Sequence, residues 1–274
     1  MRIRIQHRLS YIYENPAGSV IQVLRLTPRN HEGQRVLNWR IDLDQDVQLQ
    51  GSEDAFGNIL HTLSFVRPLD DLSITVTGEV DTHETHGVVK GTLERFPTGL
   101  YLRETPQTQI DAMVRMFARG HAGDGEPLDK LHKLMVAVNE RVECDDTAEP
   151  LPAAVKALAA KRGTKEDVTH VFIAAACSLG IPARFVAGYL VAADGDEASG
   201  AAHVWAEVFV SDLGWIGFDP VTGVSPSEAY IRVSVGLDSL GAAPVRGSHH
   251  SAPHARLEVQ VFGGLDVQPQ QQFG

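Results

Sequence analysis

Three short stretches decide the fold: GTKEDVTH at residues 163–170, HVWAEV at residues 203–208 and GWIGFDP at residues 214–220. The first stretch opens a segment, residues 166–179, whose small and apolar residues recur at helical spacing. Gly180 and Pro182 end that segment, because glycine favours a helix C-terminus and proline cannot continue the helix. The other two stretches have strand character and are separated by a turn at residues 211–214.

Working outward from these stretches, the pattern predicts more helices before them and more strands after them. Further helices are expected at residues 108–119, 128–138 and 152–160, where apolar residues recur every three or four positions. The strands after Pro182 are expected at residues 184–191, 203–210, 215–218 and 256–261. Helices followed by a meander of strands are typical of an α+β domain with an antiparallel sheet.

The first hundred residues show a different pattern. Residues 2–5, 20–26 and 72–77 alternate between polar and apolar side chains, and turn signals rich in Pro, Gly and Asn separate them. Several short strands at this spacing predict a β-sandwich. We therefore expect two domains, a β-sandwich at residues 1–103 and a helix-plus-sheet domain at residues 104–274.

Composition limits the functional classes. The 274 residues are 43% hydrophobic and 22% charged, with a formal net charge of −11. Such a charge repels phosphate backbones, so no nucleic-acid partner is expected. No apolar run approaches the ~20 residues of a membrane span, and the N-terminus lacks the apolar core of a signal peptide, so we expect no membrane association and a cytoplasmic location. The glutamine-rich stretch at 268–272 is expected to be frayed.

The three motifs resemble those of the transglutaminase-like superfamily, a group with a papain-type Cys-His-Asp site. That family carries Gly-x-Cys-x-Asp-x-x-His, then His-x-Trp-x-Glu, then Gly-Trp-x-x-hydrophobic-Asp-Pro. Every fixed position matches here except one, where Lys165 stands at the cysteine position. Residues 24–29 and 54–58 also resemble the N-terminal region of bacterial members, so the resemblance covers nearly the whole chain.

The resemblance implies a retained dyad of His203 and Asp219 next to Lys165. In the family, a cysteine thiolate at a helix N-terminus attacks an amide carbonyl, a histidine takes its proton, and an acid orients the imidazole. His203 and Asp219 must then face the same side of two consecutive antiparallel strands. An odd number of loop residues between these strands would achieve this, and Gly214 suits a three-residue loop.

Lysine cannot replace the thiolate in this chemistry, since an ordinary lysine is protonated at neutral pH. Desolvation could make it a nucleophilic amine, but its attack on an amide would yield another stable amide. Neither cysteine is expected to serve instead. Cys177 lies about 18 Å further along the helix that Lys165 opens, at ~1.5 Å per residue, and Cys144 has acidic neighbours that would raise its pKa.

Other residues receive smaller roles. Trp205, Glu166 and Thr164 are predicted to border the inherited cleft, and Asp167 and His170, one helical turn apart, are predicted to form structural hydrogen bonds. No metal or cofactor is expected. Two clusters could suggest a metal, His83 and His86 with Asp81 and Glu84, and His249, His250 and His254, but neither has the spacing of a known metal site.

The leading hypothesis is a pseudoenzyme that binds a peptide or partner protein in the cleft. The alternative is an amidase, peptidase or transamidase with altered chemistry that uses Lys165, His203 and Asp219, with the lysine as a general base, an anion-binding cation or a Schiff-base amine. A third hypothesis is a structural subunit of an operon-encoded complex for peptide synthesis or modification, since relatives are often encoded beside ligase-like proteins.

Overall fold

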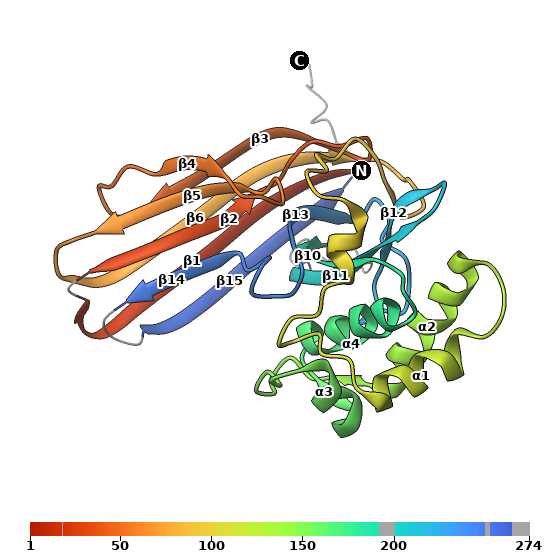
Figure 1. Ribbon diagram of the computed structural model, residues 1–274. Helices are drawn as coiled ribbons and strands as arrows, with labels where there is room; N and C mark the ends of the chain where they lie inside the picture. Colours follow the sequence, from red (N-terminus) through yellow and green to blue (C-terminus); the bar gives the residue numbers. More distant parts are fainter. Residues whose placement is uncertain (18, 192–200, 250–252, 265–274) are drawn as a thin grey trace, which may run out of the picture.

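The computed structural model describes residues 1–17, 19–191, 201–249 and 253–264. It confirms the predicted α+β class, with four α-helices gathered on one side of a mixed set of strands among the described residues (Figure 1). The α-helices are α1 (Ala112–Ala122), α2 (Pro127–Arg141), α3 (Ala154–Ala160) and α4 (Lys165–Ser178). Each lies within a few residues of the predicted segment, and a short 3₁₀ helix, η1 (Thr98–Leu102), precedes them.

The helices cover one face of a five-stranded sheet with the order β13-β10-β11-β12-β7. Its strands are β7 (Val88–Val89), β10 (Ala183–Leu190), β11 (Ala201–Val210), β12 (Gly214–Phe218) and β13 (Tyr230–Gly236). Along β11, Val204, Ala206 and Val208 belong to the same buried cluster as the apolar residues of α4. Because side chains alternate along a strand, His203, Trp205 and Glu207 lie on the opposite face.

The predicted β-sandwich is formed by two four-stranded sheets, with the orders β15-β1-β6-β3 and β14-β2-β5-β4. Their strands are β1 (Arg2–Ala17), β2 (Val20–Thr27), β3 (Gln34–Leu43), β4 (Gln50–Glu53), β5 (Ile59–Phe65), β6 (Leu69–Thr82), β14 (Val245–His249) and β15 (Pro253–Gly264). Val20, Leu24 and Leu26 alternate with more exposed residues along β2 and join a buried cluster with β1, β5 and β6. This alternation is what packs one sheet against the other.

The strand pairing does not follow the expected division at residue 103. Strands β14 and β15 return to the sandwich, where β15 pairs with β1 from Arg2↔Gly264 onward and β14 pairs with β2 (Figure 1). In the other direction, β7 pairs with β12 of the core sheet. The expected boundary at residue 103 therefore does not separate the strands by their hydrogen bonding. Pairing between strands far apart in the chain leaves no local signal in the sequence, so it could not be predicted.

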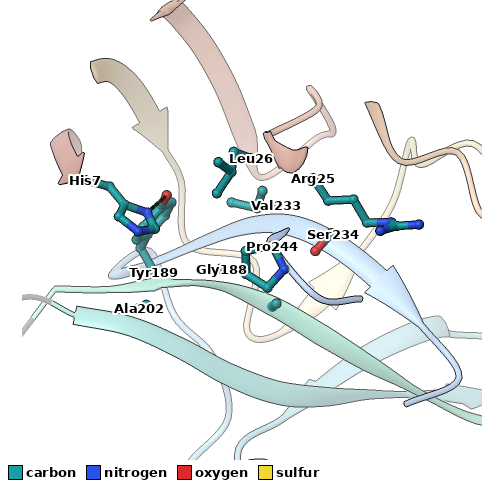
Figure 2. A pocket seen from close by; sticks show the side chains of 10 residues that line it. His7, Arg25, Leu26, Gly188, Tyr189, Ala202, Val233, Ser234 and Pro244 are labelled. Atoms are coloured by element: carbon teal, nitrogen blue, oxygen red, sulfur yellow. Dashed lines mark hydrogen bonds between the residues drawn. The ribbon is translucent and has the colours of Figure 1, made fainter. Parts of the chain in front are cut away.

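Side-chain hydrogen bonds join the sandwich to the core sheet. Gln34 donates to the carbonyl of Arg232 and accepts from its amide, at 2.9 and 2.8 Å, and Asn58 makes the same pair of bonds with Val235. Figure 2 shows a small hollow at this seam, where His7 of β1 contacts Tyr189 of β10. Their Nδ1 and hydroxyl oxygen lie 2.8 Å apart. These bonds fix the orientation of the core sheet relative to the sandwich.

No helix among the described residues is long and apolar enough to cross a membrane. The glutamine-rich stretch at 268–272 and His250 lie outside the described residues.

Candidate functional site

His203 and Asp219 form the hydrogen-bonded pair that the sequence motifs predict. His203 Nε2 and Asp219 Oδ2 lie 2.7 Å apart, and both side chains are buried. The loop between β11 and β12 has three residues, with Val210 paired to Gly214. This register places odd-numbered residues opposite odd-numbered residues, so His203 and Asp219 share a face. Because Asp219 takes up Nε2, the other ring nitrogen, Nδ1, is left for chemistry on the far side of the ring.

Asp219 has additional partners that the motifs do not indicate. The Tyr230 hydroxyl donates to Oδ2 at 2.8 Å, and the amides of Val221 and Thr222 donate to Oδ1 at 2.9 and 3.2 Å. Burial alone would raise the pKa of Asp219, but the bonds from His203, Thr222 and Tyr230 together hold the pKa below its ordinary value. The carboxylate is therefore charged and fixed when it faces the imidazole.

Tyr230 makes the dyad a group of three. Its ring lies edge-on to the imidazole of His203, with centroids 5.9 Å apart, and edge-on to Trp205 at 5.4 Å. Tyr230 is the first residue of β13, eleven residues after Asp219 in sequence. No feature of the sequence marks a tyrosine at a strand start as a partner of the dyad, because the contact depends on how β13 pairs with β10.

Lys165 is the first residue of α4, and its amine lies against β11. The Nζ donates to the carbonyl of Ala202, the residue before His203, at 3.1 Å, and to Asp146 Oδ2 at 3.4 Å. Asp146 also accepts a bond from the Lys165 amide at 3.2 Å. The Lys165 side chain is 23% exposed, so part of it faces solvent. In the sequence, Asp146 is one of the acidic neighbours of Cys144, and no local pattern marks it as a partner of Lys165.

Cys144 lies beside the start of α4 because β8 (Glu143–Cys144) pairs in parallel with β9 (Arg162–Gly163). Its Sγ donates to Asp146 Oδ1 at 3.8 Å. Partial burial and then the Asp146 carboxylate raise the pKa of this thiol to about 11, although the Lys165 charge opposes them. Cys144 is therefore a protonated thiol at neutral pH.

Cys177 lies in the last turn of α4 and donates to the carbonyl of Tyr101 at 3.3 Å. Burial raises the pKa of the Cys177 thiol to about 12. The thiols therefore both lack the thiolate character that nucleophilic catalysis requires.

The start of α4 is fixed by a capping box. The Thr164 hydroxyl accepts from the Asp167 amide at 3.3 Å, and Asp167 Oδ2 accepts from the Thr164 amide at 3.0 Å. Asp167 also accepts from the Leu151 amide at 3.1 Å, which holds the preceding loop. One turn later, His170 Nε2 accepts from the Ser239 amide at 3.0 Å. Asp167 and His170 thus make the kind of structural hydrogen bonds predicted for them.

The three residues predicted to border the cleft have different environments. Thr164 and Trp205 are buried, with 5% and 3% of their surfaces exposed, while Glu166 is half-buried. Trp205 stacks near His203, with ring centroids 6.5 Å apart. Their assignment to a ligand-binding cleft stays a prediction. Within the described parts of the chain, no three His, Cys, Asp or Glu side chains gather as metal ligands would.

A buried ionic network lies beyond Trp205 on the same face of β11. Glu207 accepts from Arg184 Nε at 2.7 Å and from Arg232 Nε at 2.7 Å, and Arg184 also pairs with Glu94. Arg184 lies over the Trp215 ring, 3.8 Å from its centroid. Burial would raise the pKa of Glu207, but the two guanidinium groups lower it to about 2. This network supports the strand that carries His203.

Comparison with known proteins agrees with this geometry. Residues 3–81 match the family described as bacterial transglutaminase-like N-terminal region, and residues 115–220 match the transglutaminase-like superfamily. The chain carries a bacterial transglutaminase-like N-terminal region and a transglutaminase-like core. The second match ends at Pro220 and so includes Lys165, His203 and Asp219.

Relatives of this transglutaminase-like chain extend over almost its whole length. An uncharacterized protein of Mycobacterium leprae is 28% identical over 279 residues, covering 95% of this chain and 97% of its own. An uncharacterized protein of Mycobacterium tuberculosis is 27% identical over 297 residues, covering 96% and 94%.

A crystal structure from Cytophaga hutchinsonii, named "Putative Cysteine Protease", has a TM-score of 0.79 at 17% identity and covers 98% of this chain and 93% of its own. This likeness confirms the fold of both the sandwich and the core.

Proposed function

We propose that this protein is a pseudoenzyme of the transglutaminase-like superfamily, in which Lys165 stands at the position of the nucleophilic cysteine. One observation carries the proposal: the amine at the start of α4 bonds to the carbonyl next to His203, beside an intact His203–Asp219 pair. The motif order, with a helix start followed by two strands that hold the dyad, supports the same reading.

The surroundings of Lys165 favour binding over covalent chemistry. Both of its side-chain partners, the Asp146 carboxylate and the Ala202 carbonyl, are acceptors that suit a charged ammonium. A protonated amine has no lone pair for attack on a carbonyl. Neither Cys144 nor Cys177 replaces the missing nucleophile, because burial raises the pKa of both thiols.

The ligand that suits this cleft is a peptide or a segment of a partner protein. On this proposal, the exposed part of the ammonium donates to a backbone carbonyl of the ligand. Proteins of a peptide-synthesis or modification operon are candidate partners on this proposal.

Binding without turnover is directly testable. Fluorescein-labelled peptides from a casein digest, measured by fluorescence anisotropy, should bind saturably to the unaltered protein. Lys165→Glu and His203→Ala should each weaken binding by about tenfold or more, equivalent to at least ~1.4 kcal/mol. Lys156→Glu, the same charge change at an exposed position of α3, is the matched control and should leave binding unaltered.

Mass spectrometry of the same mixtures decides between the two main hypotheses. The pseudoenzyme predicts unchanged peptide masses and, in a parallel mixture with aldehydes or ketones, no adduct at Lys165 after borohydride treatment. Cleaved, deamidated or crosslinked peptides, or an adduct lost in Lys165→Ala, would instead establish the alternative of an enzyme with lysine chemistry. Absence of saturable binding to any peptide would remove the cleft-binding function.

A further inference from the structure

The seam between the sandwich and the core sheet contains a buried histidine. His7 of β1 is 2% exposed, and its Nδ1 lies 2.8 Å from the hydroxyl oxygen of Tyr189 in β10 (Figure 2). The other ring nitrogen, Nε2, is buried and has no hydrogen-bond partner within the residues that the structure describes. One nitrogen of the ring therefore joins the two parts of the molecule, and the other is unused.

A protonated His7 has no acceptor for its second N–H in the closed seam. Both ring nitrogens of an imidazolium are donors, and the Tyr189 hydroxyl lies only at Nδ1. The positions opposite His7 in the neighbouring strands are Val76 of β6 and Val259 of β15. A proton added at Nε2 is therefore a buried donor without a partner among the described residues.

The charged residue beside the ring is a cation. The hollow that His7 lines has a volume of about 20 Å³, which is room for about one water molecule. Arg25 lines the same hollow, and its Nε pairs with Asp54 Oδ2 at 3.1 Å. Burial lowers the pKa of His7 to about 4. A positive charge on the ring is therefore disfavoured while the seam is closed.

The seam contact lies close to the candidate site. Tyr189 stands opposite Ala202 in the pairing of β10 with β11, and His203 is the next residue along β11. Ala202 also lines the hollow beside His7, and its carbonyl accepts a hydrogen bond from the Lys165 amine at 3.1 Å. A change at the seam therefore has a short route to the residues that hold the amine.

We propose that the His7–Tyr189 contact makes the seam acid-sensitive and thereby regulates the site at Lys165. A proton on Nε2 of His7 opens the seam locally, and the paired stretch of β10 and β11 that carries Ala202 opens with it. The Ala202 carbonyl then no longer holds the Lys165 amine. The opening itself is independent of the proposed peptide binding, whereas its effect on a ligand rests on that function.

Proton linkage sets the size of the response. In an open seam His7 has its ordinary pKa of 6.5, and in the closed seam its pKa is about 4. The closed form is therefore fully stable above about pH 6.5 and loses stability as the pH falls toward 4. Between pH 7 and pH 5, the ratio of open to closed seam should rise about twentyfold. Exposed carboxylates remain mostly charged at pH 5, so histidines dominate this range.

Amide hydrogen exchange measured by NMR tests the opening in the intact protein. Rates at pH 7 and pH 5 are divided by the intrinsic rate of each amide at that pH. We expect the protection of Tyr189 and His203 to fall about twentyfold, while that of Leu24, inside the sandwich, stays constant. Unaltered protection at Tyr189 would overturn the acid sensitivity. An equal fall at Leu24 would overturn the local opening, because it would show that the whole molecule unfolds.

Two variants assign the response to His7. His7→Phe removes the titrating group, and His7→Gln does so while keeping a polar group that can bond to Tyr189. In both variants, protection at Tyr189 should change by less than about twofold between the two pH values. His61→Gln is the matched control and should keep the full response. Burial also lowers the pKa of His61, but His61 stands opposite the buried Leu24 in the sandwich and does not line the hollow.

A fall in protection that persists in both His7 variants would overturn the proposal. It would assign the response to another group, such as His31 or His170, whose pKa values burial also lowers. A fall at Tyr189 without one at His203 would overturn the connection between the seam and the site.

Discussion

At the scale of single residues, Lys165 and the dyad determine what this site can do. A cysteine thiolate beside an imidazole can attack an amide carbonyl, whereas the Lys165 amine donates a hydrogen bond to the carbonyl of Ala202, the residue before His203. The Lys165 amine forms an ion pair with the exposed carboxylate of Asp146. An exposed pair of this kind stabilises the fold by about 0–1 kcal/mol. On the pseudoenzyme proposal, this site holds carbonyl groups by hydrogen bonding and does not begin acyl transfer.

Tyr230 should contribute to the dyad through Asp219. Tyr230→Phe removes a bond to a buried charged oxygen and should cost about 1.5–3 kcal/mol in the free energy of unfolding. Because the folded pKa of Asp219 is below its ordinary value of 3.8, its stabilisation is present above that pH and is lost as the pH falls toward the folded pKa. When the pH is lowered from neutral to acid, the free energy of unfolding of Tyr230→Phe, measured with urea, should fall by less than that of the unaltered protein.

Tyr11→Phe, in β1 of the sandwich, is the control for the loss of a hydroxyl. Equal acid dependence in the two variants would contradict the role given to Tyr230.

At the scale of elements, the start of α4 and the β11–β12 loop position the site. The sequence predicts both, since a helix stop at Gly180 and Pro182 and a three-residue loop before Gly214 are local signals. The sequence does not predict that Asp146 bonds to Lys165 or that Tyr230 bonds to Asp219. It also does not predict that β14 and β15 return to the sandwich. Each depends on pairing between segments far apart in the chain, and their local residues carry no pattern that distinguishes one partner strand from another.

The capping box should measurably stabilise α4. Thr164→Ala removes the hydroxyl that accepts from the Asp167 amide and should cost about 1 kcal/mol, within a range of about 0.5–2. Ser178→Ala, at the other end of the same helix, should cost less than ~0.5 kcal/mol, because its hydroxyl bonds only to a carbonyl one turn earlier. Urea denaturation of both variants makes the comparison, and a larger cost for Ser178→Ala would contradict the capping role.

At the scale of the whole molecule, charged and polar bonds tie the sandwich to the core. Arg232 pairs with Glu207 through its side chain and with Gln34 through its backbone, so one residue connects the buried network to the sandwich. The C-terminal strands also connect the two parts of the molecule, because β15 follows the core in sequence and pairs with β1 along most of the length of β1. The core therefore depends on the sandwich for the face that carries Trp205 and Glu207.

Removing the central charge of this network should be strongly destabilising. Glu207→Gln leaves Arg232 without a carboxylate and the buried Arg184 with Glu94 alone, and it should cost about 3–5 kcal/mol. Since the pKa of Glu207 is lowered from 4.5 to about 2, the unaltered protein should lose this stability as the pH falls from 4.5 through 2, and the variant should lack that loss. Glu79→Gln, which breaks the exposed pair with Arg4, should cost under ~1 kcal/mol.

The measurement that bears most directly on the pseudoenzyme proposal is the reactivity of a thiol placed at residue 165. In Lys165→Cys, iodoacetamide at neutral pH should label residue 165 more than about tenfold faster than Cys144 or Cys177, whose pKa values of about 11 and about 12 keep them protonated. The advantage should be lost when His203→Ala is added. Labelling of residue 165 at the rate of an ordinary thiol, with or without His203, would show that the amine does not stand in a nucleophile's position.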